Sequence, residues 1–377
     1  MINKKRLVNT FKKLVRIDSL SLREGEVNKF LRRELRSLGL RVSEIGKPQG
    51  GDAGSLVAFW PGQGSGDPCI LLNAHTDTVS PGRGIRPVEK KGSLRSDGKT
   101  ILGADNKAGV AAILEVLRTI KEKKLPHPPL RIVFTVAEEI GLCGAKALPA
   151  KAFAADFGLI VDGGDIHEIV TQAPTQYSLT ATVIGRAAHA GLRPEEGINA
   201  IKVAGEAIAR MKLGRIARDT TANIGLIEGG TATNIVPERA EIKGEARSHD
   251  EKKLKRQVQQ MEKALFDAGR RSGAQVKIRV ERAYKAFKVK EDSEPVRLAA
   301  EVLKAAGLKY VIKKTGGGSD ANIFNERGVP SLILGVGADQ VHTTKENLPV
   351  GAFVQGTENL LSMIRGAASW QSLKKKK

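Results

Sequence analysis

Residues 69–77, Cys-Ile-Leu-Leu-Asn-Ala-His-Thr-Asp, join a short apolar run to a polar end. The apolar run reaches residue 74, and its length is typical of a buried strand. Further strand-sized apolar runs lie at 130–136 and 159–161, and apolar residues at helical spacing indicate a helix at 108–121. Short buried strands that alternate with helices predict an α/β domain whose mainly parallel sheet is covered on both faces.

The pattern changes at about residue 174 and changes back at about residue 287. Between these points we expect the order strand, helix, strand, strand, helix, strand, which is typical of a small α+β ferredoxin-like domain. Its segments are 178–184, 199–211, 223–227, 239–247, 254–265 and 276–280. The sequence therefore predicts a first domain formed by residues 1–173 and 287–377, interrupted by an inserted domain at 174–286.

Composition excludes several classes of protein. The 377 residues are 41% hydrophobic and 27% charged, as in an ordinary globular protein, so the chain is not disordered as a whole. No stretch approaches the ~18 uncharged apolar residues of a membrane span. Basic residues exceed acidic ones by 62 to 41, a net charge of +21, which favours loose association with anions. No helix-turn-helix, zinc-finger or RNP-type pattern is present. We expect no membrane association and no specific nucleic-acid binding, and we interpret the lysine run at 374–377 as a solvated tail.

The chain has two cysteines, Cys69 and Cys143, both in apolar contexts. Two cysteines cannot form a disulfide framework, so we expect buried, reduced thiols and a cytoplasmic location. Residues 1–20 are basic and have helical spacing, but they lack the apolar core of an export signal.

Five side chains that could bind a metal through nitrogen or oxygen lie at the ends of expected strands or in loops. His75, Glu139 and Asp162 follow the three apolar runs, Asp105 precedes the helix at 108–121, and His342 lies in a loop far downstream. Ligands of open α/β sheets bind at the carboxyl ends of strands. Each residue alone also has a structural explanation, such as a helix cap for Asp105. Together, two histidines and three carboxylates without a thiolate suit a pair of Zn²⁺, Co²⁺ or Mn²⁺ ions. A shared carboxylate could hold two such ions about 3.5–4 Å apart.

These residues fall within motifs that resemble the M20 family of co-catalytic metallopeptidases, and within it the peptidase T-like (tripeptidase-like) branch. The resemblance covers nearly the whole chain. It implies a dinuclear-metal catalytic domain with an inserted lid or dimerisation domain. The motifs lie at 73–78 (Asn-Ala-His-Thr-Asp-Thr), 103–105 (Gly-Ala-Asp), 137–141 (Ala-Glu-Glu-Ile-Gly), 161–163 (Val-Asp-Gly), 185–191 (Gly-Arg-Ala-Ala-His-Ala-Gly), 246–250 (Ala-Arg-Ser-His-Asp), 317–320 (Gly-Gly-Ser-Asp) and 341–342 (Val-His).

The resemblance implies two metal ions, zinc with cobalt or manganese as alternatives. His75 and Asp162 would hold one ion, Glu139 and His342 would hold the other, and Asp105 would bridge them.

The resemblance also implies catalytic and substrate-binding residues. Asp77 would orient His75, and Glu138 would be the general base, which takes a proton from the metal-bridged water and later delivers it to the leaving amine. His189 would help to stabilise the oxyanion. Contacts to substrate would come from Asn234, Arg247, Gly317 and Gly318.

One position departs from the family pattern. Many relatives have a second aspartate after the bridging one, whereas this chain has Asn106. The resemblance still implies a cis peptide bond there, because asparagine is close to aspartate in shape.

The sequence thus predicts a cytoplasmic, dimeric metallo-aminopeptidase of the tripeptidase-like type that cleaves short peptides. One alternative of the same fold is an amidohydrolase or deacylase acting on N-acyl amino acids. Two others are a metal-dependent binding protein without turnover and a nucleic-acid binder that uses the +21 charge.

Overall fold

The computed structural model describes residues 1–64 and 66–374, so the last three residues of the lysine run lie outside the described part of the chain. These residues form two compact units. Unit 1 consists of Met1–Gln172, Phe287–Thr315 and the described part of Ser319–Lys377, and unit 2 consists of Ala173–Ala286 and Gly316–Gly318.

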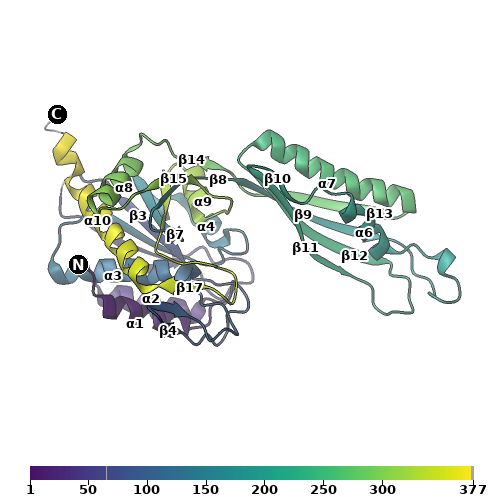
Figure 1. Cartoon of the computed structure of the whole chain (residues 1–377), viewed down its shortest axis with the longest axis horizontal. Helices are drawn as coiled ribbons and strands as arrows, with labels where there is room; N and C mark the ends of the chain where they lie inside the picture. Colours follow the sequence, from purple (N-terminus) through teal and green to yellow (C-terminus); the bar gives the residue numbers. More distant parts are fainter. Residues whose placement is uncertain (65, 375–377) are drawn as a thin grey trace. The chain divides into compact units, whose positions relative to one another are not determined.

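Unit 1 is built on a large mixed sheet (Figure 1). Its four central strands run parallel to one another, and antiparallel pairs flank them. This arrangement agrees with the predicted parallel sheet at the centre and differs from it at the flanks. In spatial order the strands are β1 (Val42–Ile45), β2 (Ser55–Trp60), β6 (Leu130–Thr135), β3 (Ile70–His75), β7 (Phe157–Gly163), β16 (Ser331–Gly335), β8 (Glu168–Ala173) and β14 (Phe287–Lys288), with β15 (Val311–Lys314) paired to β8.

All six residues of β3 are buried, so both faces of the sheet are covered at its centre. The helix α3 packs against β3 and β7, and α1 and α10 pack against α3. The rings of Phe11 in α1 and Phe353 in α10 meet edge to face, 5.7 Å apart. The helices of unit 1 are α1 (Lys4–Val15), α2 (Gly25–Ser37), α3 (Ala104–Lys123), α4 (Cys143–Ala147), α5 (Ala150–Phe153), α8 (Glu294–Ala305), α9 (Asp320–Glu326) and α10 (Val350–Lys374).

A small antiparallel sheet in unit 1 contains the C-terminal strand β17 (Asn347–Pro349), which pairs with β5 (Ser93–Arg95). The strand β4 (Val88–Lys90) completes it. This sheet joins the segment after residue 338 to the loop that precedes α3.

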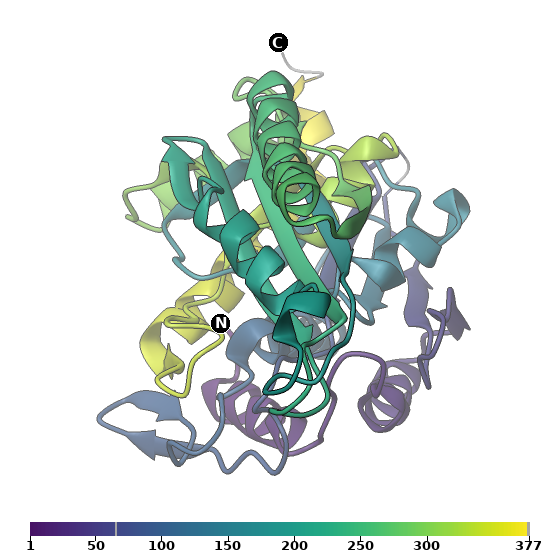
Figure 2. The ribbon, with the colours of Figure 1, turned by 90° about the vertical axis from the view of Figure 1, so that its right-hand side faces the viewer.

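Unit 2 is a five-stranded antiparallel sheet with two helices on one face (Figure 2). Apart from the short first strand of the sheet, the order is β11, β12, β9, β13. This is the arrangement of a ferredoxin-like domain and confirms the predicted fold class. Alternating apolar residues of the strands and the apolar stripes of both helices form its core. The elements are β9 (Thr175–Ile184), α6 (Ala200–Ala209), β10 (Gly214–Ala217), β11 (Thr220–Gly229), β12 (Arg239–Ser248), α7 (Glu251–Ser272) and β13 (Gln275–Tyr284), with a 3₁₀ turn at Pro194–Glu196.

Two further expectations concern membranes and thiols. Among the described residues, none of the helices is both long enough and apolar enough to span a membrane. Cys69 and Cys143 are both free thiols, as expected, but they are half-buried rather than buried.

Candidate metal centre

The candidate ligands of unit 1 lie at one edge of the sheet, where the central parallel strands end. His75 is the last residue of β3, and Asp162 lies near the end of β7. Glu139 follows β6, and His342 follows β16 in the chain. Asp105 lies in the first turn of α3, where its backbone is not helical and its peptide bond to the next residue is cis, as the resemblance implied. Because parallel strands end at the same edge, residues distant in sequence come together here.

The carboxylate of Asp105 lies between the two histidines. Its Oδ1 is 3.1 Å from Nε2 of His75, and its Oδ2 is 3.3 Å from Nε2 of His342. Asp162 lies on the first side, with Oδ1 3.4 Å from Nε2 of His75. Glu139 lies on the second side, with Oε1 3.0 Å from Nε2 of His342. The five side chains therefore form two groups of three that share Asp105.

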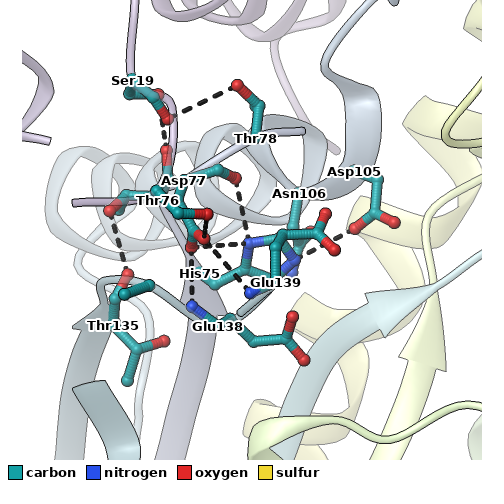
Figure 3. A network of polar contacts seen from close by, with 12 residues as sticks. Ser19, His75, Thr76, Asp77, Thr78, Asp105, Asn106, Thr135, Glu138 and Glu139 are labelled. Carbon is teal, nitrogen blue, oxygen red and sulfur yellow. Dashed lines mark hydrogen bonds and ion pairs between the residues drawn. The ribbon is translucent and has the colours of Figure 1, made fainter. Parts of the chain in front are cut away.

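His75 is only 2% exposed, and Asp77 contacts Nδ1 of its ring. Its Nδ1 is 3.1 Å from the Asp77 carbonyl oxygen and 3.3 Å from Asp77 Oδ1, so Nδ1 carries the donated proton. The other ring nitrogen then directs its lone pair at the carboxylate of Asp105 (Figure 3). The carboxylate of Asp162 faces the same nitrogen. A lone pair facing two anionic oxygens requires a proton or a metal cation between them.

Three successive backbone N–H groups fix the loop that carries the two adjacent glutamates. The N–H of Ala137 donates to Glu24 Oε1 at 2.8 Å. The N–H groups of Glu138 and Glu139 donate to Oδ1 and Oδ2 of Asp77 at 3.0 and 3.2 Å. Ala137 has a φ of 50°, in the left-handed region that is unfavourable for alanine, so these bonds stabilise a turn that the chain would otherwise avoid.

In the metal-free chain the histidines are strongly basic. Hydrogen bonds to Asp105 and Glu139 raise the pKa of His342 to about 10. Burial of His75 opposes its protonation, but the carboxylates of Asp105 and Asp162 outweigh burial and raise its pKa well above the usual value. Burial likewise opposes the ionisation of Asp105, yet hydrogen bonds from both histidines lower its pKa.

The pKa values of two other carboxyl groups, those of Glu138 and Asp320, are raised rather than lowered. Burial raises the pKa of Glu138 well above its ordinary range, and although His75 opposes this, the charges of Asp162 and nearby acids add to it. Burial also raises the pKa of Asp320 to about 7. The cluster thus holds more negative charge than its imidazoles can balance, which favours binding of cations.

The donor set fits a divalent metal. Among the described residues, His75, Asp105 and Glu139 each offer one potential ligand atom, and these three atoms lie within 4.8 Å of one another. Imidazole and carboxylate ligands without a thiolate are typical of sites for zinc and similar borderline ions.

The sequence matches the family described as peptidase family M20/M25/M40 over residues 71–366. The chain belongs to this family. It is therefore a hydrolase of the metallopeptidase type, as the motifs predicted.

Three relatives of this M20 chain are similar over almost their whole length. A tripeptidase from Staphylococcus aureus is 42% identical, with a TM-score of 0.88 over 98% of this chain and 99% of the relative. Aminopeptidase PepT from Bacillus cereus is 41% identical, with a TM-score of 0.82 over 97% of this chain and 99% of that one. The uncharacterized protein YqjE of Bacillus subtilis is 40% identical over 371 residues, which are 98% of this chain and 100% of the relative.

Other residues that the M20 resemblance singled out lie in unit 2. His189 is exposed, and its Nδ1 accepts the N–H groups of Gly191 and Leu192 at 3.2 and 3.1 Å. Its Nε2 must therefore carry the proton and act as a donor. The neighbouring loop is paired with this segment, because the N–H of Ala190 donates to the carbonyl oxygen of Asn234 at 3.0 Å.

Arg247 and the glycine segment have identifiable partners within unit 2. The Nε and Nη2 groups of Arg247 donate to Glu245 at 2.7 and 2.9 Å, which fixes the guanidinium plane. A Cβ on Gly318 would lie 2.2 Å from the Tyr284 ring, so packing already requires glycine there. Gly317 precedes it in the same three-residue segment of unit 2.

Sequence reasoning missed several residues that support the site in unit 1. Glu24 and Ser21 lie in the loop before α2, and Ser21 donates to Asp77 Oδ2 at 2.7 Å. Asp320 was part of the motif at 317–320, but no role was assigned to it. It is buried at the start of α9, accepts a hydrogen bond from Thr135, and has one oxygen without a partner among the described residues. Glu346 contacts the loop of Asp105. The signal for the supporting acids would have been their burial. A single sequence does not show which acidic side chains are buried.

We expect Asp77→Asn to weaken metal binding about 10- to 100-fold, because it replaces the anion behind His75 with a neutral amide and places an NH₂ group against backbone donors. Competition with a chromophoric chelator measures the change. Asp292→Asn, at an exposed position, is the matched control. Equal affinities of the two variants would show that Asp77 does not support the metal centre.

Proposed function

We propose that this chain is a dinuclear-metal exopeptidase that removes the N-terminal residue from short peptides, in the manner of a tripeptide aminopeptidase. The observation that carries the proposal is the position of Asp105, whose two oxygens face different histidines at 3.1 and 3.3 Å. A carboxylate placed in this way is suited to two cations, one on each side. The names of two relatives at 41–42% identity, PepT and tripeptidase, support a peptide substrate.

In this proposal His75 and Asp162 hold one metal ion, Glu139 and His342 hold the other, and Asp105 contacts both. The ions are zinc, with cobalt or manganese as alternatives. When bound, such ions lower the pKa of water and polarise the carbonyl of the scissile peptide bond. The histidines, with strongly raised pKa values in the metal-free chain, lose their protons when the metals bind.

Glu138 is proposed as the general base. Its backbone N–H is fixed by Asp77, and its side chain is 8% exposed, so the carboxylate is kept apart from bulk water. In the metal-free chain burial raises the pKa of this carboxyl. With cations beside it, removal of the water proton would depend as much on the lowered pKa of the water as on Glu138 itself. Glu138 would accept the proton of the attacking water and deliver it to the nitrogen of the leaving amine.

Residues of unit 2 are proposed to bind the substrate. The Nε2–H of His189 is available to donate a hydrogen bond to the oxyanion of the tetrahedral intermediate. Arg247 is proposed to bind the terminal carboxylate, with its guanidinium held in plane by Glu245. Further contacts are assigned to Asn234, Gly317 and Gly318.

We expect Glu138→Ala to bind two metal ions per chain and to lose at least ~99% of turnover, because proton transfer typically contributes about 10²–10⁴-fold. Elemental analysis gives the metal content, and ninhydrin detection of released amino acids gives the rate. Glu291→Ala, at an exposed position, serves as the control. Hydrolysis at a normal rate by the Glu138 variant would exclude it as the base.

The main alternative is an amidohydrolase of the same fold that removes an acyl group from an N-acyl amino acid. Both reactions break an amide, so the metal centre alone does not distinguish them.

A panel of di-, tri- and tetra-alanine and N-acetyl amino acids tests substrate choice. We expect trialanine to be hydrolysed at least 10-fold faster than the N-acetyl compounds, with activity lost on chelation and restored by zinc or cobalt. Preference for the N-acetyl compounds would favour the deacylase. Metal binding without hydrolysis of any member would favour a binding protein.

A homodimer through unit 2 is the proposed assembly. The short β10 pairs only with residues 220–222 of β11, so the outer edge of the later part of β11 is not covered by β10. Four large apolar side chains near this edge are 41–55% exposed: Ile201, Leu226, Ile227 and Ile235. Uncovered strand edges with apolar side chains are suited to pairing with a second chain.

The free thiols Cys69 and Cys143 are compatible with the proposed cytoplasmic location.

Leu226→Asp should convert the dimer to a monomer, because a charge would be buried at the contact between copies. Sedimentation velocity at micromolar concentration measures the change, with Phe266→Asp on the exposed side of α7 as the control. A monomeric parent protein, or an unaltered dimer in the Leu226 variant, would contradict an assembly through β11.

A further inference from the structure

The two histidines of the metal centre are supported very differently. His75 ends a buried core strand, whereas His342 belongs to a run of exposed residues, 339–345. The His342 side chain is 49% exposed, and its backbone has a φ of 63°, in the left-handed region. Some contact must hold this exposed loop where its imidazole can face Asp105.

Glu346 is the first buried residue after that run, with 1% exposure. Its carboxylate accepts three backbone N–H groups, two from the loop before α3 and one from the first turn of α3. Oε2 accepts those of Leu102 and Gly103, both at 2.7 Å, and Oε1 accepts that of Asp105 at 3.0 Å. The loop of His342 is thereby fixed to the residue that lies between the two histidines.

Only an ionised carboxylate satisfies this arrangement. Both oxygens of Glu346 must accept, since all three neighbours are N–H donors. A glutamine of the same shape would place its NH₂ group against at least one of them, and two donors repel. Hydrogen bonds from N–H groups to a charged acceptor are stronger than those to a neutral one, so we expect their loss to release an exposed loop.

We propose that Glu346 is a positioning residue that holds the loops of Asp105 and His342 together, and that it supports the His342 side of the metal centre selectively. Asp105 is shared by both sides, but the His75 side keeps two further candidate ligands, His75 and Asp162, on core strands. On the His342 side the loop that carries the imidazole is itself exposed, so loss of Glu346 affects this side more. The selective effect on one metal ion rests on the proposed dinuclear function, whereas the effect on the two loops does not.

Hydrogen exchange of the metal-free protein tests the positioning directly. In Glu346→Gln we expect at least 10-fold faster exchange in peptides that cover 99–106 and 339–348, with the peptides of β3 and of unit 2 unchanged. The exposed variant Glu291→Gln is the matched control. Unchanged exchange in both segments would overturn the proposal, whether or not the protein binds metal.

Metal titration with chelator competition tests the selectivity. For the parent protein we expect two bound ions, and for Glu346→Gln one ion of near-normal affinity and a second weakened about 10- to 100-fold. Equal weakening of both ions, or of neither, would overturn selective support. A parent protein that binds a single ion would contradict both the dinuclear function and this selectivity, and the exchange data would still decide the positioning role.

Glu346→Asp separates positioning from a general role in folding. It keeps the charge but is one methylene shorter, so it cannot reach all three donors. We expect local exchange changes in the same two segments. Faster exchange throughout unit 1 in both variants would show that Glu346 stabilises the whole unit, and this too would overturn the proposal.

Discussion

Buried carboxylates that accept backbone N–H groups hold the loops on which the metal centre depends. Asp77 accepts from the two residues after Ala137, Glu24 accepts from Ala137 itself, and Glu346 accepts from Asp105. A carboxylate is suited to this task because it offers only acceptors and can bind two or three N–H groups at once. Each contact fixes a backbone segment, so the side chains that face the metal positions are free to project from it.

The same carboxylates also make the site strongly negative, so that it requires bound cations. Carboxylates that hold the backbone add negative charge beside those that face the metal positions, and burial prevents water from screening it. Burial raises the pKa values of Glu24 and Asp320 to about 7 in the metal-free chain, and the charge of Asp77 adds to both shifts. Bound metal cations would relieve this negative charge, which links the stability of the loops to metal binding.

Much of the fold was predictable because its signals are local. The run before His75 has the length and apolarity of a core strand, and β3 occupies Ile70–His75. The periodicity at 108–121 predicted α3 but not its first turn, where Asp105 and Asn106 have non-helical backbone angles. Two flanking strands of the large sheet, β1 and β2, and two strands of the small sheet, β4 and β5, were missed. β1, β4 and β5 are only three or four residues long, and each is defined by its pairing with a partner strand rather than by composition.

The candidate ligands could be picked out because strand ends meet at one edge of a parallel sheet, a rule of topology that needs no coordinates. Their roles remain predictions. Glu24 and Glu346 could not be found in this way, since they act through contacts 113 and 241 residues away along the chain. A sequence shows that an acid is present but not that it is buried against backbone donors.

The candidate ligands are carried by different parts of unit 1, so they differ in how easily they can move. His75 and Asp162 belong to core strands, so their positions change only if the sheet does. His342 depends on an exposed loop that is joined to the rest of unit 1 by Glu346 and by the pairing of Asp339 with Asn347. Local opening of such a loop costs far less than unfolding of the core. The part of the candidate site that contains His342 is therefore the part that can open locally without disturbing the sheet.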